Sequence, residues 1–358
     1  MHYVDGEVPA VAERRYADVV RVLDEFFDSS GRRAVGHGPQ YVELWRQLRE
    51  NTTGGKLFRP RMVIAAYEGL GGLDRSAVAW VGAAFELLHT ALIVHDDVID
   101  RDFVRRGRPN ISGSYRDRAL QSGVANVEAE HRGLSAAVVA GDLALFYSYR
   151  LIDRSGVDDA TRLRLLELMD DALFASAAGE LLDLDYSGAI SIPTVESLLT
   201  MARLKTAVYS FEGPLKAGAV LAGASDAVVA SMEDFGREIG TAYQIVDDLL
   251  GVFGDSAVTG KSTTSDLREG KRTVLVAHAA ETELWSDIAP LFGSPTLSEL
   301  EAGELRAMLD ASGARAYAEQ LLAQHVHRAR EILDRTHIPV ELKHELEPII
   351  DVVLRRGR

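Results

Sequence analysis

The sequence predicts an all-α fold, and three features of the 358-residue chain support that prediction. Proline is scarce, with 10 residues in the whole chain. Apolar residues recur mostly at spacings of three and four, with Ala, Leu, Glu and Arg between them, which is the pattern of long amphipathic helices. No stretch shows the sustained apolar–polar alternation of a half-buried strand. We therefore expect helices along most of the chain.

Breaks in the helical pattern divide the chain into its expected elements. Turn-rich stretches at 31–39, 51–55 and 69–74 predict helix ends, with a new helix opening near Lys56. Helices are predicted at about 76–100 and 133–152, a polar, loop-like stretch at 106–132, a Gly/Ser/Thr-rich loop at 253–267 and a turn at 293–295. None of these breaks has the composition of a linker, so we expect one domain over residues 1–358.

Composition excludes several classes of protein. The chain has 54 acidic and 39 Lys or Arg residues, a net charge of −15, which argues against nucleic-acid binding because a phosphate backbone needs a basic face. The absence of cysteine excludes disulfides, thiolate catalysis and zinc–thiolate sites. The N-terminal residues lack the apolar region of a secretory signal, and no uninterrupted apolar run reaches about 18 residues. We therefore expect no transmembrane segment and a cytoplasmic location.

An acidic cluster ends the helix predicted at 76–100. Asp96 and Asp100 are four residues apart and share a helix face, with Asp97 beside them. Like charges at this spacing repel, so a compensating cation is expected. Oxygen ligands without cysteine favour Mg²⁺, which shares its coordination sphere with substrate phosphates. Taken alone, such a motif is more often a solvated acidic helix end, with nearby arginines as surface partners.

The residues around this cluster favour a metal–diphosphate site. The apolar run 91–94 precedes the acids, which places them at the end of a buried helix, and His89 lies two turns back on the face of Asp96. The basic segment FVRRGRP, with Arg105 and Arg106, follows the acids. Carboxylates bind the metal ions in such a site, and guanidinium groups bind the outer phosphate oxygens.

A second acidic cluster follows 151 residues after the first, since 247 − 96 = 151, and so lies on another helix. Gln244, Asp247 and Asp248 share one side of that helix through their i, i+3 and i+4 spacing. Two acidic patches facing one cavity would bind a small cluster of Mg²⁺ around one diphosphate.

Cationic residues accompany both clusters. Lys56 and Arg59 follow a Gly-Gly loop at a helix start, where backbone N–H groups and two cations make an anion site. Lys205-Thr206 lies in an Ala/Val-rich helix, and Lys261 and Lys271 follow the second cluster. Each of these residues alone is more often an ordinary helix start or a surface lysine, but their joint occurrence favours phosphate binding.

The motifs resemble, in order, those of the trans-isoprenyl diphosphate synthase (polyprenyl synthetase) family over roughly residues 50–280: GGKLFRP, ELLH, DDVIDRDFVRRGRP, GDLAL, KTA, YQIVDDLLGVFGD and GKSTTSDLREGKRT. The resemblance implies a single large helical bundle around a central cavity, usually a homodimer. It implies head-to-tail condensation of isopentenyl diphosphate with an allylic diphosphate, with about three Mg²⁺ per active site.

The resemblance also implies a role for each candidate residue. Asp96 and Asp100 would bind Mg²⁺ on the allylic diphosphate with support from Asp97, and Asp247 would bind a further Mg²⁺ with support from Asp248. Arg105, Lys205 and Lys261 would grip the allylic diphosphate, and Lys56, Arg59, His89 and Arg106 would grip isopentenyl diphosphate. Lys205, Thr206 and Gln244 form the implied catalytic set, in which Thr206 and Gln244 place oxygens near the developing cation, and Lys271 would help to close the loop.

The chemistry of the implied reaction fits these residue types. Ionising a carbon–oxygen bond to diphosphate requires stabilisation of the leaving group, which metals and Lys or Arg supply. The resulting cation needs a dry pocket, and the loops at 106–132 and 253–270 are expected to cover it. One position departs from the family pattern: many members have a third aspartate where this chain has Gly251, and Asp255 is a candidate replacement.

The residues of the helix before the first cluster also predict the length of the product. A rise of about 1.5 Å per residue places Leu92 about 6 Å and Leu88 about 12 Å below Asp96, with Ala91 beside that stripe. Farnesyl-making relatives often carry aromatic residues at the positions of Ala91 and Leu92. The small Ala91 leaves room for a longer chain, so we expect geranylgeranyl diphosphate (C20), with farnesyl or longer products as alternatives.

Two other functions are compatible with parts of the pattern. A class I terpene cyclase shares the helical architecture and an Asp-rich motif, but it does not need the second diphosphate site that Lys56, Arg59 and Arg106 indicate. A non-catalytic subunit of a synthase tends to lose the Asp-rich motifs, and both are present here. The exact product, the preferred allylic primer and the downstream pathway are left open by the sequence.

Overall fold

A computed structural model describes residues 10–53, 55, 57–105, 107–187, 191–254 and 264–356. Within these ranges the regular structure is helical apart from one short hairpin, so the predicted all-α fold is confirmed. The described residues fall into two compact units. Among the described residues, the N-terminal unit comprises 10–169 and 216–224, and the C-terminal unit comprises 170–215 and 225–356. The single domain expected over residues 1–358 stays a prediction.

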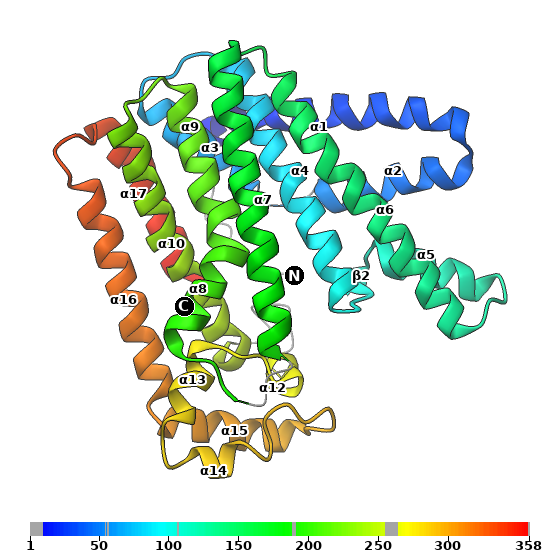
Figure 1. Cartoon of the computed structure of the whole chain (residues 1–358), viewed down its shortest axis with the longest axis vertical. Helices are drawn as coiled ribbons and strands as arrows, with labels where there is room; N and C mark the ends of the chain where they lie inside the picture. The colour runs from blue at the N-terminus through cyan, green and yellow to red at the C-terminus, as the bar shows by residue number, and fades with distance from the viewer. Residues whose placement is uncertain are drawn as a thin grey trace. The chain divides into compact units, whose positions relative to one another are not determined.

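The N-terminal unit is built around helix α4 (Arg75–Ile99), which packs against α1, α3 and α6 (Figure 1). Asp74 caps α4 by accepting a hydrogen bond of 2.8 Å from the backbone N–H of Ser76. The other elements of this unit are α1 (Ala10–Ala34), η1 (Val35–His37), α2 (Pro39–Thr52), α3 (Phe58–Gly69), β1 (Val104–Arg105), β2 (Arg108–Pro109), α5 (Ile111–Gln121) and α6 (Asn126–Asp153).

The C-terminal unit is built around α10 (Asp226–Phe253), which packs against η2, α16 and α17 (Figure 1). Helices α7 (Asp159–Ser187) and α9 (Gly213–Leu221) each contribute residues to both units. The remaining elements are α8 (Val195–Ala202), η2 (Arg203–Glu212), α12 (Ser265–Glu269), α13 (Val274–Ala280), α14 (Trp285–Ile288), α15 (Glu299–Ala311), α16 (Ala314–Leu333) and α17 (Val340–Arg356).

The stretch 106–132, predicted to be loop-like, is largely helical, so that prediction is wrong. After the β1–β2 hairpin the chain forms α5 and the beginning of α6. Asn110 starts α5 by accepting a hydrogen bond of 2.8 Å from the N–H of Gly113. The polar residues that suggested a loop lie largely on exposed faces of α5 and α6. Residues 31–34, expected to be part of a turn, are the last turn of α1.

In the part of the chain that the structure describes, two helices, α4 and α6, are long and apolar enough to span a membrane by length and composition alone. The most apolar window of α4 is 78% buried inside the protein, as expected for a core helix, whereas that of α6 is 39% buried. A buried core helix passes the same test, so this observation is weak evidence for a membrane span. The predicted absence of a transmembrane segment therefore stays a prediction.

Candidate active site

The acidic cluster of the N-terminal unit lies in the last turn of α4. Asp96 and Asp97 belong to the helix, and Asp100 is its C-cap, whose N–H donates to the carbonyl of Asp96 at 2.9 Å. These residues differ sharply in exposure. Asp97 is 3% exposed, Asp96 is half-buried and Asp100 is exposed. The carboxylates of Asp96 and Asp100 are therefore accessible at the end of the helix, whereas that of Asp97 is buried in the protein.

Both carboxylate oxygens of Asp97 are bonded to protein groups. Arg105, on β1, donates to Oδ1 from Nε at 2.8 Å and from a terminal nitrogen at 2.5 Å. Asn110 donates to Oδ2 at 2.9 Å. Burial raises the pKa of Asp97 above its ordinary value, and the bonds from Arg105 and Asn110 oppose that rise. The same guanidinium lies 3.3 Å from Asp96, so Asp97 fixes Arg105 beside the cluster.

The donor set at this helix end fits Mg²⁺. Among the residues that the structure describes, no three His, Cys, Asp or Glu side chains form a ready-made metal cage. Mg²⁺ sites for phosphate substrates need no such cage, because one or two carboxylates are completed by waters and phosphate oxygens. Asp96 and Asp100 provide two such carboxylates on one face. The metal role predicted for Asp97 stays a prediction, since its oxygens contact Arg105 and Asn110 here.

The other predicted residues of the N-terminal unit lie along α3 and α4. Arg59 is half-buried in the first turn of α3, and His89 is half-buried on α4. Residue Leu57, the N-cap of α3, has a left-handed backbone with φ of +47°, which is unfavourable for a residue with a side chain. Strain of this kind is often found at ligand-binding loops. Lys56 and Arg106 lie outside the described residues.

The three predicted chain-length residues occupy different environments on α4. Leu88 and Ala91 are each 0% exposed, and Leu92 is half-buried. Leu92 is therefore the member of this set whose side chain reaches accessible space in the described structure.

The second acidic cluster lies on α10 in the C-terminal unit. Gln244 donates through Nε2 to Oδ1 of Asp248 at 3.0 Å, as the i, i+4 spacing predicts. Asp248 is 6% exposed, and burial raises its pKa to about 6, although Lys271 and the bond from Gln244 oppose the rise. Burial by itself would lower the pKa of Lys271, but the surrounding carboxylates outweigh it and raise that pKa.

Several carboxylates act electrostatically on Lys271. These carboxylates belong to Asp248, Asp266, Asp247 and Asp183, and they raise its pKa. Such a concentration of negative charge fits a site for a divalent cation, because a bound cation would favour the ionised acids. The negative charge of the acidic cluster therefore acts on Lys271. The loop-closing role predicted for this residue stays a prediction.

Asp266 supplies an acid beside the position where the family's third aspartate is missing. A Cβ atom added to Gly251 would lie only 2.0 Å from Oδ2 of Asp266, so this carboxylate fills the space next to α10. The sequence signal for Asp266 was its place between Lys261 and Lys271, but no role was assigned to it. Asp255, the predicted replacement, and Lys261 lie outside the described residues.

Lys205 and Thr206 lie on η2, a ten-residue π-helix. Nζ of Lys205 lies 2.6 Å from Oδ2 of Asp183 and 3.1 Å from Oε2 of Glu180, both on α7. Sequence reasoning missed these two acids. Their i, i+3 spacing in the segment GELLDLD, within an otherwise apolar stretch, was the signal that could have identified them.

Comparison with known proteins identifies the family. The family model described as polyprenyl synthetase matches residues 42–289, which is more than half of the chain. The chain belongs to the polyprenyl synthetase family. The sequence resemblance is thereby confirmed, and so is the prediction that the protein is a transferase of the prenyltransferase type.

Individual relatives of this family member agree with that assignment. A geranylfarnesyl diphosphate synthase from Aeropyrum pernix is 33% identical over 308 residues, covering 85% of this chain and 91% of the relative. A geranylgeranyl diphosphate synthase from Mycobacterium tuberculosis is 32% identical over 310 residues, covering 83% and 82%. The geranylgeranyl pyrophosphate synthase of Corynebacterium glutamicum, solved with isoprenyl diphosphate and magnesium, superposes with a TM-score of 0.87 at 28% identity, covering 96% and 98%.

Proposed function

We propose that this prenyltransferase condenses isopentenyl diphosphate head-to-tail with an allylic diphosphate in a Mg²⁺-dependent reaction whose main product is geranylgeranyl diphosphate. The observation that carries the proposal is the pairing of each acidic cluster with its own cation. Arg105 is fixed by Asp97 beside Asp96, and Lys271 is surrounded by Asp247, Asp248 and Asp266. Paired acids and cations of this kind suit a metal-bound diphosphate.

Mg²⁺ would be held by Asp96 and Asp100 with support from Asp97, and a further Mg²⁺ would be held by Asp247 with support from Asp248. About three Mg²⁺ ions would be involved, as the family resemblance implies. When bound, Mg²⁺ supplies positive charge that stabilises the leaving diphosphate. The buried Asp248 and its bond to Gln244 keep the neighbouring turn of α10 in one arrangement.

The chain's own cations complete the binding of the allylic diphosphate. Asp183 and Glu180 hold the ammonium group of Lys205 beside α7, and this cation is proposed to bind a phosphate oxygen. Arg105 has donors beyond those bonded to Asp97. Lys261 is proposed for the same task, and Lys271 for closing the loop. Oxygens of Thr206 and Gln244 would face the developing allylic cation.

Isopentenyl diphosphate would bind to the cations near the start of α3. Arg59 lies in the first turn of α3, and His89 on α4, Lys56 and Arg106 complete the proposed set. Isopentenyl diphosphate attacks the allylic cation through its double bond, forming the new carbon–carbon bond. The proton then lost from the adjacent carbon passes to the departed diphosphate, so no strongly basic side chain is needed.

The C20 product rests on the small Ala91 and on relatives. The Mycobacterium tuberculosis and Corynebacterium glutamicum proteins bear the name of geranylgeranyl synthases. The Aeropyrum pernix relative is named for a product one isoprene unit longer, so longer chains are the main alternative. A farnesyl product is the shorter alternative.

Homodimer formation is part of the proposal, and α6 offers the surface for it. Val127, Val138, Val139 and Phe146 on this helix are 82%, 42%, 50% and 60% exposed, respectively. Exposed apolar helix faces commonly mark protein interfaces. Sedimentation velocity should show a dimer for the wild type, and Phe146→Glu should weaken it. A monomeric wild type would contradict this part of the proposal, and cell fractionation would test the proposed cytoplasmic location.

A product assay tests the main proposal. The purified protein is incubated with Mg²⁺, isopentenyl diphosphate and, separately, C5, C10 and C15 allylic diphosphates, and the dephosphorylated products are sized by mass. Products ending at C20 are expected, together with their loss in the Asp96→Asn/Asp100→Asn double variant. A longest product other than C20 would be consistent with the enzyme class but would refute the C20 assignment. Allylic diphosphate consumed without isopentenyl diphosphate would favour a terpene cyclase, and no turnover would favour a non-catalytic subunit.

A further inference from the structure

The helix that carries Lys205 and Thr206 has an unusual form. Element η2 is a π-helix from Arg203 to Glu212, with Lys205 and Thr206 near its beginning. π-Helices are rare and usually occupy a single turn, and they are frequent at functional sites. A π-helix of ten residues therefore needs surroundings that hold it in this form.

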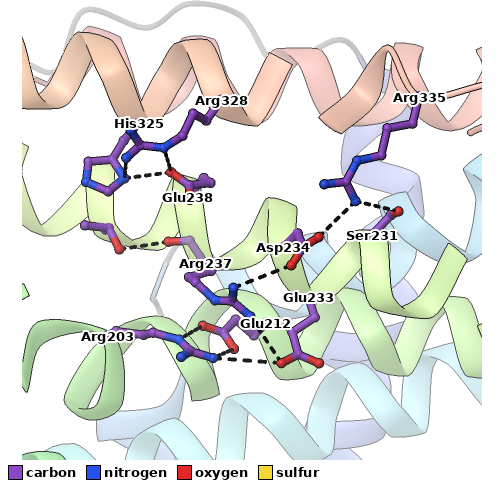
Figure 2. A network of polar contacts seen from close by, with 11 residues as sticks. Arg203, Glu212, Ser231, Glu233, Asp234, Arg237, Glu238, His325, Arg328 and Arg335 are labelled. Atoms are coloured by element: carbon purple, nitrogen blue, oxygen red, sulfur yellow. Dashed lines mark hydrogen bonds and ion pairs between the residues drawn. The ribbon is translucent and has the colours of Figure 1, made fainter. Parts of the chain in front are cut away.

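The first and last residues of η2 are joined to each other. Nε of Arg203 donates to Oε1 of Glu212 at 2.8 Å, and a terminal nitrogen donates to Oε2 at 3.0 Å (Figure 2). This is the two-pronged geometry in which guanidinium and carboxylate bind most strongly. Glu212 is 3% exposed, and its hydrogen bond raises the pKa of Arg203. The pair therefore spans the π-helix from end to end.

A more loosely bonded acid lies near the same guanidinium. Glu233 on α10 is 3.8 Å from Arg203 and 3.4 Å from Arg237 (Figure 2). It shares the charge environment of Glu212 without joining the two ends of η2. Glu233 is therefore a matched control for the loss of one negative charge at this place.

Glycines on two neighbouring helices let the backbone of η2 lie against them. A Cβ on Gly179 of α7 would come within 2.2 Å of the backbone nitrogen of Lys205. On α10, a Cβ on Gly240 would lie 2.5 Å from Cβ of Ala207, and a Cβ on Gly236 would lie 2.7 Å from Cα of Glu212. Contacts this close place the backbone of η2 directly against α7 and α10.

We propose that Arg203 and Glu212 are positioning residues for the prenyl transfer, because their ion pair fixes the π-helical register and with it the directions of Lys205 and Thr206. The inference rests on the proposed function of those two residues. If the pair is broken, η2 can relax towards the commoner i to i+4 bonding, which rotates the side chains that follow Arg203. Neither Arg203 nor Glu212 needs to touch substrate for this effect.

Steady-state kinetics of two variants test the inference. Glu212→Gln keeps the side-chain volume and removes the negative charge. Arg203→Lys keeps the positive charge and removes the guanidinium group that makes the two-pronged contact. Both variants are expected to lower kcat by about 10- to 100-fold, the range that a misplacement of about 1 Å can cause. The KM for isopentenyl diphosphate should stay within about two-fold of the wild type, because its proposed ligands are elsewhere. Glu233→Gln should retain wild-type kcat.

The outcomes separate a positioning role from a merely structural one. Circular dichroism establishes that each variant is folded, and if Glu212→Gln is unfolded, Arg203→Lys carries the test by itself. Hydrogen exchange of the η2 amides should quicken in the folded variants. Wild-type kcat in the folded variants, or an equal loss in Glu233→Gln, would overturn the inference. An inactive wild type would refute the proposed function instead, so the two failures are distinguishable.

Discussion

A Cβ atom at position 251 would lie 2.0 Å from Oδ2 of Asp266, so the carboxylate of Asp266 occupies the space that a side chain at Gly251 would need. Position 251 is where many family members carry a third aspartate on this helix. In this chain the acid near that position comes from α12 instead of α10. Glycine at 251 is therefore what allows Asp266 to approach α10.

Restoring an aspartate at position 251 should harm the protein. In Gly251→Asp the new side chain would displace Asp266, and overpacking of this kind costs about 1–3 kcal/mol in the free energy of unfolding. Urea unfolding should show that loss, and Gly251→Ala should show a loss from the same clash. Adding Asp266→Ala to Gly251→Ala should recover part of the stability because the clashing group is gone. Wild-type stability in Gly251→Asp would show that Asp266 moves aside freely.

Variants of Asp97 should affect mainly stability, whereas variants of Asp96 and Asp100 should affect mainly activity. Asp97→Asn removes the charge that Arg105 binds and should lower the free energy of unfolding by about 1–3 kcal/mol, less than for a fully buried pair because Arg105 remains partly exposed. Asp96→Asn and Asp100→Asn should unfold near the wild-type urea midpoint, yet lose about 100-fold or more in kcat. Equal destabilisation of all three variants would refute this division of roles.

The contact between α10 and α16 should weaken in acid. Glu238 accepts a hydrogen bond from Nε of Arg328 at 2.8 Å, and the same carboxylate oxygen lies 2.7 Å from Nδ1 of His325 (Figure 2). Burial favours the neutral acid, but these contacts outweigh burial and lower the pKa of Glu238. Stability from this group is therefore fully present above the unfolded pKa of about 4.3 and is lost as the pH falls through the lower folded value.

Glu238→Gln tests that pH dependence. At pH 7 the variant should be about 1–3 kcal/mol less stable than the wild type, because the contacts with Arg328 and His325 lose the negative charge of the carboxylate. The difference should shrink as urea unfolding is repeated at pH 5, 4 and 3. Glu331→Gln on α16, where the acid is exposed beside His327, is the control and should change little. A difference that stays constant with pH would contradict the assignment.

Product length should respond to both Ala91 and Leu92. A phenylalanine at either position adds bulk to the predicted wall, so Ala91→Phe and Leu92→Phe should each shift products below C20. Ala91 is fully buried, so its replacement should also destabilise the protein by about 1–3 kcal/mol, whereas the half-buried Leu92 should tolerate the change better. Mass analysis of products and thermal unfolding measure both effects. Unchanged products in both variants would show that this stretch of α4 does not line the tail.

The long apolar helices were predictable because their periodicity is strong. The predicted helix at 76–100 agrees with α4 within one residue at each end, and its terminal acids were found from spacing alone. The stretch 106–132 was misread because α5 is mostly polar, and a pattern read without its packing partner α6 resembles a loop. Two-residue strands such as β1 are too short to show any alternation.

Tertiary contacts explain what the sequence could not predict at the site. Asp96 and Asp97 are adjacent and chemically identical, and only the fold turns one outward and directs the other to Arg105 and Asn110. Glu180 and Asp183 become candidates only when η2 brings Lys205 beside α7. The π-helical form of η2 itself depends on glycines far away in sequence, such as Gly179 and Gly240.

Asn110 gives the N-terminal cluster a property that matters for the timing of catalysis. Its amide donates both to Asp97 and to the carbonyl of Asp102, while its oxygen accepts from Gly113 at the start of α5. The orientation of Arg105 is therefore set when the chain folds and does not have to be found each time substrate arrives. A preorganised guanidinium spares each turnover the reorganisation free energy that water would require to solvate the leaving group.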